Sequence, residues 1–115
     1  MMSQDLLEKI LKNRINGELQ DLIDFLKMYK KGSFIYPSAL KRKFNYSDKE
    51  VYNILSILEK DKVITMFYEV ICDNCNRTIQ LVQYYKDLEE FYYCEDCENN
   101  LNTLYSVKIV YKVEK

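Results

Sequence analysis

The sequence predicts an α+β fold: a winged helix-turn-helix with a four-cysteine zinc ribbon inserted in or following the wing. Three observations support this prediction. Amphipathic helical patterns fill the first half of the chain, β-prone segments flank the cysteine region, and the cysteines form two Cys-x-x-Cys pairs. We divide the chain into a winged helix-turn-helix core at 1–71, a zinc ribbon at 72–103 and a return strand at 104–115 that pairs with 63–71.

Two amphipathic helices are expected first. Leucine and isoleucine recur at helical spacing over Asp5–Asn13 and again over Glu18–Lys31. Gly32 follows two lysines and is a predicted helix stop, because glycine readily adopts the left-handed conformation found after helix ends.

Two further helices should form a helix-turn-helix. Pro37 suits the first turn of a short helix that ends at Phe44. Ser47 and Glu50 have the spacing of a capping box, which starts a helix that runs to about Lys60. Its predicted buried face consists of Val51, Ile54, Leu55 and Leu58.

The β-prone segments complete the pattern. They are Phe34–Tyr36, Val63–Ile71, Thr78–Tyr85, Glu90–Tyr93 and Leu104–Glu114. Three helices closed by a β-hairpin form a winged helix. Here the hairpin strands would be Val63–Ile71 and Leu104–Glu114, and the cysteine segment lies between them, at the position of the wing. A generic small α+β domain is the alternative.

The cysteines carry the most specific chemical signal. Cys72 and Cys75 form one pair and Cys94 and Cys97 the other, with 18 residues between the pairs. Two residues between paired cysteines let one turn direct both sulfurs at one ion, and this gap lets a hairpin bring the second turn opposite the first. We therefore predict one structural Zn²⁺ site with these four ligands.

Other readings of the cysteines stay open. Two disulfides would need an oxidising compartment, a redox pair would be expected near a βαβ pattern, and a rubredoxin-like iron site fits the same spacing. Each turn also needs a residue with positive φ after its second cysteine. Asn76 follows the first pair, and Glu98, Asn99 and Asn100 follow the second; asparagine tolerates this conformation best among non-glycine residues.

Composition excludes several function classes. The chain has no histidine and two glycines, so histidine-based catalysis and glycine-rich phosphate loops are absent, and we expect no enzymatic activity. No apolar run is long enough to span a membrane, and the first residues lack the pattern of a signal peptide, so we expect a cytoplasmic protein.

Charge is unevenly distributed. The net charge is −1, but residues 1–70 have a net charge of +2 and residues 71–115 a net charge of −3. No acidic residue occurs between Phe25 and Ser47, where several lysines lie. Basic residues before the fourth helix are placed to touch a DNA backbone, and its outward residues to contact bases or phosphate. The candidate DNA-binding residues are Lys41, Arg42, Lys43, Lys49, Tyr52 and Asn53.

Two functions follow from these patterns. The first is a zinc-binding transcriptional regulator that contacts double-stranded DNA. The alternative is an adaptor or subunit of a larger complex, in which the winged helix and the acidic ribbon dock protein partners. A homodimer is compatible with both.

The helix-turn-helix Pro37–Lys60, the strand Val63–Ile71 and the two cysteine pairs together resemble the alpha subunit of archaeal and eukaryotic general transcription factor E. The resemblance spans roughly Glu18 to Cys97. It implies that the four cysteines bind zinc and that the winged helix binds partner proteins and melted promoter DNA beside a polymerase. That family usually separates the two modules with a long helix, whereas here the strand leads directly into Cys72. Small winged-helix regulators or subunits from bacteria and their mobile elements, with a ribbon inserted in the wing, fit at least as well.

Overall fold

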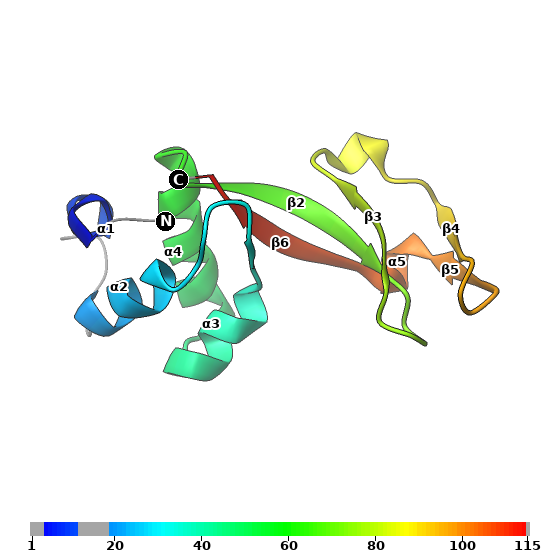
Figure 1. Ribbon diagram of the computed structural model, residues 1–115, viewed down its shortest axis with the longest axis horizontal. Coiled ribbons are helices and arrows are strands. Elements are labelled where there is room, and N and C mark those ends of the chain that lie inside the picture. The colour runs from blue at the N-terminus through cyan, green and yellow to red at the C-terminus, as the bar shows by residue number, and fades with distance from the viewer. Residues whose placement is uncertain (1–3, 12–18, 115) are drawn as a thin grey trace. The chain divides into compact units, whose positions relative to one another are not determined.

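The computed structural model describes residues 4–11 and 19–114, and it has an α+β fold with antiparallel sheets (Figure 1). The chain divides into two compact units. The first contains the described residues up to Thr65 and from Tyr111 onward, and the second is Met66–Val110. No helix among the described residues is both long and apolar enough to cross a membrane.

The first unit contains helices α1 (Gln4–Leu11), α2 (Leu19–Lys27), α3 (Pro37–Phe44) and α4 (Asp48–Lys60). Helix α1 packs against α2 and α4, and α3 packs against α4. Helices α1, α2 and α4 bury the apolar stripes that their sequence spacing predicts, and α3 buries Leu40. The fully buried side chains of this core include Leu7, Leu11, Leu22, Ile23, Leu26, Ile35, Leu40, Leu55 and Leu58.

Helix α2 ends at Lys27, earlier than the predicted stop at Gly32. The amides of Met28 and Tyr29 bond to carbonyls three residues back, which tightens the final turn. The Met28 side chain is 76% exposed, so the apolar stripe of the helix has ended there. Gly32 does have a positive φ of 89°, but it lies in the turn before the first strand. The predicted boundaries at Asn13 and Glu18 lie outside the described residues.

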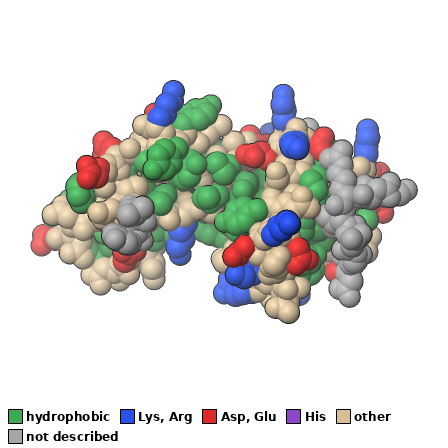
Figure 2. All heavy atoms as spheres, turned by 180° about the vertical axis from the view of Figure 1, so that it is seen from behind, with side chains coloured by type: hydrophobic (Ala, Val, Ile, Leu, Met, Phe, Trp, Pro, Cys, Tyr) green, Lys and Arg blue, Asp and Glu red, His purple; other side chains and the backbone are tan. Residues whose placement is uncertain are grey.

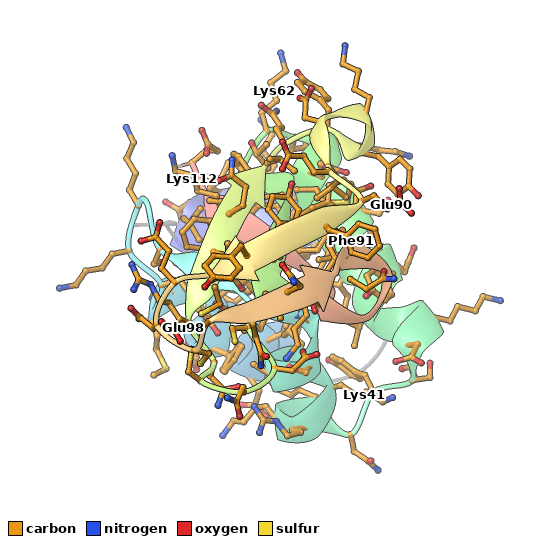
Figure 3. The ribbon with its side chains drawn as sticks, turned by 90° about the vertical axis from the view of Figure 1, so that its right-hand side faces the viewer. Lys41, Lys62, Glu90, Phe91, Glu98 and Lys112 are labelled. Atoms are coloured by element: carbon orange, nitrogen blue, oxygen red, sulfur yellow. The ribbon has the colours of Figure 1, made fainter. Side chains whose placement is uncertain are left out.

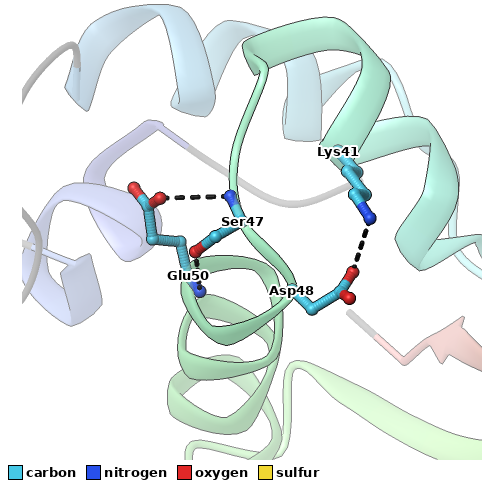
Figure 4. A network of polar contacts seen from close by, with 4 residues as sticks. All are labelled: Lys41, Ser47, Asp48 and Glu50. Atoms are coloured by element: carbon cyan, nitrogen blue, oxygen red, sulfur yellow. Dashed lines mark hydrogen bonds and ion pairs between the residues drawn. The ribbon is translucent and has the colours of Figure 1, made fainter.

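The predicted capping box at the start of α4 is confirmed. The Glu50 amide donates to Ser47 Oγ at 3.2 Å, and the Ser47 amide donates to Glu50 Oε1 at 3.1 Å (Figure 4). The preceding helix ends at Phe44, and the next residue, Asn45, has a left-handed φ of 56°. Together these two features define the sharp turn between α3 and α4.

The larger sheet has the order β1-β6-β2-β3. Its strands are β1 (Phe34–Ile35), β6 (Val107–Val113), β2 (Ile64–Ile71) and β3 (Thr78–Val82). Strand β1 pairs antiparallel with β6, and β2 pairs antiparallel with β3. The N-terminal strand and the C-terminal strand are therefore neighbours, although they are far apart in sequence.

The second unit also contains a two-stranded hairpin of β4 (Phe91–Cys94) and β5 (Asn99–Asn102). Short helices η1 (Tyr85–Asp87) and α5 (Thr103–Ser106) flank it. Two predictions need correction here. Strand β5 was not expected, and the last strand begins at Val107 rather than Leu104 because residues 103–106 form a helical turn.

Candidate metal centre

The four cysteine sulfurs lie together in the second unit. All four lie within 4.8 Å of one another, and the Cys75 and Cys94 sulfurs are 3.7 Å apart. Tetrahedral zinc with Zn–S bonds of about 2.3 Å needs sulfurs roughly 3.8 Å apart. The predicted ligands therefore converge on one point at distances that fit a single metal ion.

The turn at each cysteine pair depends on one residue with positive φ. In the first turn this residue is Asn76, with φ 61°, as predicted; its amide donates to the Cys72 carbonyl at 2.8 Å. In the second turn the residue is Glu98, with φ 55°, and not one of the asparagines that follow it. Both turns therefore have the same kind of bend. Within each turn, the two cysteine sulfurs lie on the same side and face the shared cluster.

The ligand cluster is buried on one side and open on the other. Cys72 and Cys94 are fully buried and form a small apolar cluster with Leu101, while Cys75 is exposed and Cys97 is partly buried. The cluster also includes the partly buried side chains of Ile79 and Tyr92. Three of the four candidate metal ligands, Cys72, Cys94 and Cys97, are thus part of the apolar core of this unit.

The close packing of the cysteines shifts the pKa values of two of their thiols in opposite directions. Hydrogen bonding from the Cys75 amide lowers the pKa of Cys72 to about 7. The hydrogen bond that Cys97 shares with the Cys75 sulfur, together with burial, raises the pKa of Cys97 to about 12. Four thiolates this close repel one another, so a cation is needed to hold them all ionised.

An ion pair joins the two turns. The Arg77 guanidinium donates to the Asp96 carboxylate, and this hydrogen bond raises the pKa of Arg77. The Arg77 carbonyl also accepts a 2.9 Å bond from the Cys72 amide. No local pattern in the sequence predicts this pair, because residues 19 positions apart meet only when the two turns face each other.

The donor set defines the chemistry. Four thiolates in a tetrahedral arrangement bind zinc, and they also suit iron. They fill the coordination shell and leave no position for a reacting water, so the arrangement suits a structural ion. The sulfurs of Cys75 and Cys94 are well beyond the disulfide bond length of about 2.05 Å.

The candidate DNA-binding residues lie in the first unit, away from the cysteines in sequence. All six are exposed, three on α3 and three on α4: Lys41, Arg42, Lys43, Lys49, Tyr52 and Asn53. The Lys41 Nζ lies 2.9 Å from Asp48 Oδ1 and so links the two helices (Figure 4).

Comparison with known proteins gives no match to a family model, to a curated protein or to a solved structure.

Proposed function

We propose that this protein is a non-enzymatic, zinc-stabilised winged-helix regulator that binds duplex DNA through α3 and α4. The zinc site would hold the second unit together, and the helix pair of the first unit would make the DNA contacts. The resemblance to general transcription factor E is compatible with this role.

The sheet order supports the winged-helix assignment. In a winged helix, a short strand before the helix-turn-helix pairs with the last strand of the wing. Here β1 pairs with β6, with Phe34 opposite Lys112, and β6 also neighbours β2. A turn of three residues joins α3 to α4, which is the length typical of a helix-turn-helix.

One observation carries the DNA-binding proposal: six exposed residues able to contact DNA lie on two packed helices. Three consecutive basic residues on α3 suit phosphate contacts, and Asn53 on α4 has an amide that can pair with an adenine edge. In the sequence, residues 1–65 and 111–115 carry 14 Lys/Arg and 10 Asp/Glu, whereas residues 66–110 carry 3 and 8. Positive charge is thus concentrated in the unit that carries the helix pair.

The donor set supports zinc as the ion. Four thiolates are the ligands of zinc ribbons, and two knuckle turns face each other across the site. Metal analysis of the purified protein should find one zinc per chain. Iron in its place would change the identity of the ion and leave the structural role intact.

The test is duplex DNA binding by the metal-loaded protein across a salt series. We expect the affinity to fall as salt rises, because phosphate contacts release counterions. Replacing Lys41, Arg42 and Lys43 with glutamine should weaken binding and reduce the log–log salt slope by about 2 to 3, since each lost contact removes about 0.9.

A matched control separates specific contacts from bulk charge. Glutamine at Lys9, Lys86 and Lys108 removes the same net charge from exposed positions on other elements. This control should retain most of the affinity. No binding at low salt would refute the DNA-binding proposal and favour the adaptor alternative, in which the helix pair docks a protein.

A further inference from the structure

The second unit has a hollow of about 440 Å³ beside the zinc ribbon hairpin. Its lining comes from η1, the loop after it, β5, α5 and the start of β6. The lining residues include Tyr85, Leu88, Glu89, Glu90, Thr103 and Val107. Partly buried Leu88 and Val107 provide apolar surface, while both glutamates are exposed. The hollow therefore combines apolar lining with acidic groups.

Backbone hydrogen bonds hold the acidic loop in place. The Thr103 amide donates to the Glu90 carbonyl at 3.1 Å, and the Thr103 hydroxyl donates to the Glu89 carbonyl. The Glu89 amide donates to the Tyr92 hydroxyl at 3.0 Å. With three backbone groups bonded, the two carboxylates project from a loop that is already ordered, which lowers the entropic cost of binding.

The charged side chains that line the hollow are acidic. Among the residues that the structure describes, neither Glu89 nor Glu90 forms an ion pair, and no lysine or arginine lines the hollow. The whole unit has a net charge of −5. Figure 2 shows acidic and apolar side chains next to one another on the face of the molecule that it draws. A cation would be attracted here, and a phosphate backbone would be repelled.

Exposed aromatic rings extend the surface along β4. Phe91 and Tyr93 are 56% and 51% exposed and alternate along one face of the strand, and Tyr85 at the hollow is 76% exposed. Figure 3 places Glu90 beside Phe91. The unit already contains a cation over a ring, since the Lys86 amine lies 5.7 Å from the Tyr84 ring centre.

We propose that this hollow and the aromatic face beside it bind a Lys/Arg-rich segment of a partner polypeptide. An arginine or lysine has an apolar stem, which matches Leu88 and Val107, and a charged head, which matches the two carboxylates. Neighbouring basic residues of the segment would lie over Phe91 and Tyr93. This names the partner chemistry of the adaptor alternative, and it does not require DNA binding by the first unit.

The experiment measures fluorescence anisotropy of a short labelled peptide of alternating arginine and serine, titrated with the full metal-loaded chain. A peptide of alternating glutamate and serine is the peptide control. Binding of the basic peptide should weaken about tenfold in the double variant E89Q/E90Q, which removes both carboxylates. The variant F91A should weaken it about two- to fivefold, as expected for loss of a cation–π contact.

The matched control is the double variant D21N/E59Q, which removes two exposed charges from the first unit. It should change peptide affinity less than about twofold at moderate salt. Equal weakening by this control would mean that bulk charge alone attracts the peptide and would overturn the proposal. Absence of peptide binding would also overturn the proposal. So would binding of labelled single-stranded DNA that is tighter than binding of the peptide and that is abolished in F91A. Duplex DNA binding is assayed separately, so the two proposals fail independently.

Discussion

Replacing Cys94 with serine should loosen the second unit and leave the helices of the first unit folded. Cys94 is fully buried and belongs to both the ligand set and the small apolar cluster with Cys72 and Leu101. A serine there removes one of four thiolate ligands and leaves a hydroxyl in an apolar site. Both effects act on the same small core.

A bound metal should contribute more to the stability of this hairpin than apolar packing does. A fully buried leucine contributes about 1.5–3 kcal/mol. Among the described residues, the buried part of this cluster is Leu101 with two cysteines, and Ile79 and Tyr92 pack against it partly buried. Binding of structural zinc contributes on the order of 10–16 kcal/mol in zinc-finger peptides at neutral pH. The apolar cluster therefore cannot replace the ion, and the hairpin should lose its order when the site fails.

Hydrogen exchange detected by mass spectrometry separates the two units. In the C94S variant, and in the wild type after chelation, the amides of Cys72 and Asn76 should lose protection. The Val51 amide, which bonds to the Ser47 carbonyl in α4, should keep it. The control is L101A, which removes apolar packing at a cost of about 2–5 kcal/mol but retains every ligand and so should still respond to zinc.

Either of two results would refute the reasoning. If C94S binds one metal with unchanged affinity and keeps its amide protection, Cys94 is not a ligand. If chelation unfolds α4 together with the hairpin, the two units do not fold separately.

Three further predictions concern single groups. Ser47→Ala should destabilise the first unit by about 1 kcal/mol in urea unfolding, because the Glu50 amide loses its acceptor; no change would mean that the capping box contributes nothing. Asp48→Asn should tighten duplex binding, since it releases Lys41 and removes a negative charge from the start of α4, while lost ion pairing costs at most about 1 kcal/mol; weaker binding would contradict this. Zinc affinity, measured by chelator competition, should fall as pH falls, because bound thiols must be deprotonated, by about tenfold per pH unit for each proton released. Without metal, the pKa of Cys72 is about 7, so below that pH zinc binding must release one more proton and the affinity should fall more steeply with pH. A pH-independent affinity would exclude thiolate ligands.

Local patterns in the sequence predicted much of the fold correctly. The spacing of apolar residues identified the helices, and Ser47 with Glu50 identified where α4 begins. The segment Val63–Ile71 was recognised by its β-branched and aromatic residues, and the structure has β2 at Ile64–Ile71. These features depend on residues within a few positions of one another, so they are readable without the fold.

Elements that depend on distant partners were missed. Strand β5, Asn99–Asn102, contains three asparagines, which have low β propensity, yet it pairs with β4 and buries Leu101 against Cys72 and Cys94. The helical turn at 103–106 interrupts a segment that had the alternation of a strand. In both cases tertiary contacts outweighed local preference.

The cysteine spacing alone predicts the candidate metal ligands, because two Cys-x-x-Cys turns separated by a hairpin-length segment can meet at one ion. Only the tertiary structure decided what surrounds them: the Arg77–Asp96 pair, the left-handed Glu98, and the acidic loop tied to Thr103. The physical reason is separation along the chain. Ligand spacing within each turn is a local property, whereas ion pairs and hollows form between residues that only the folded backbone brings together.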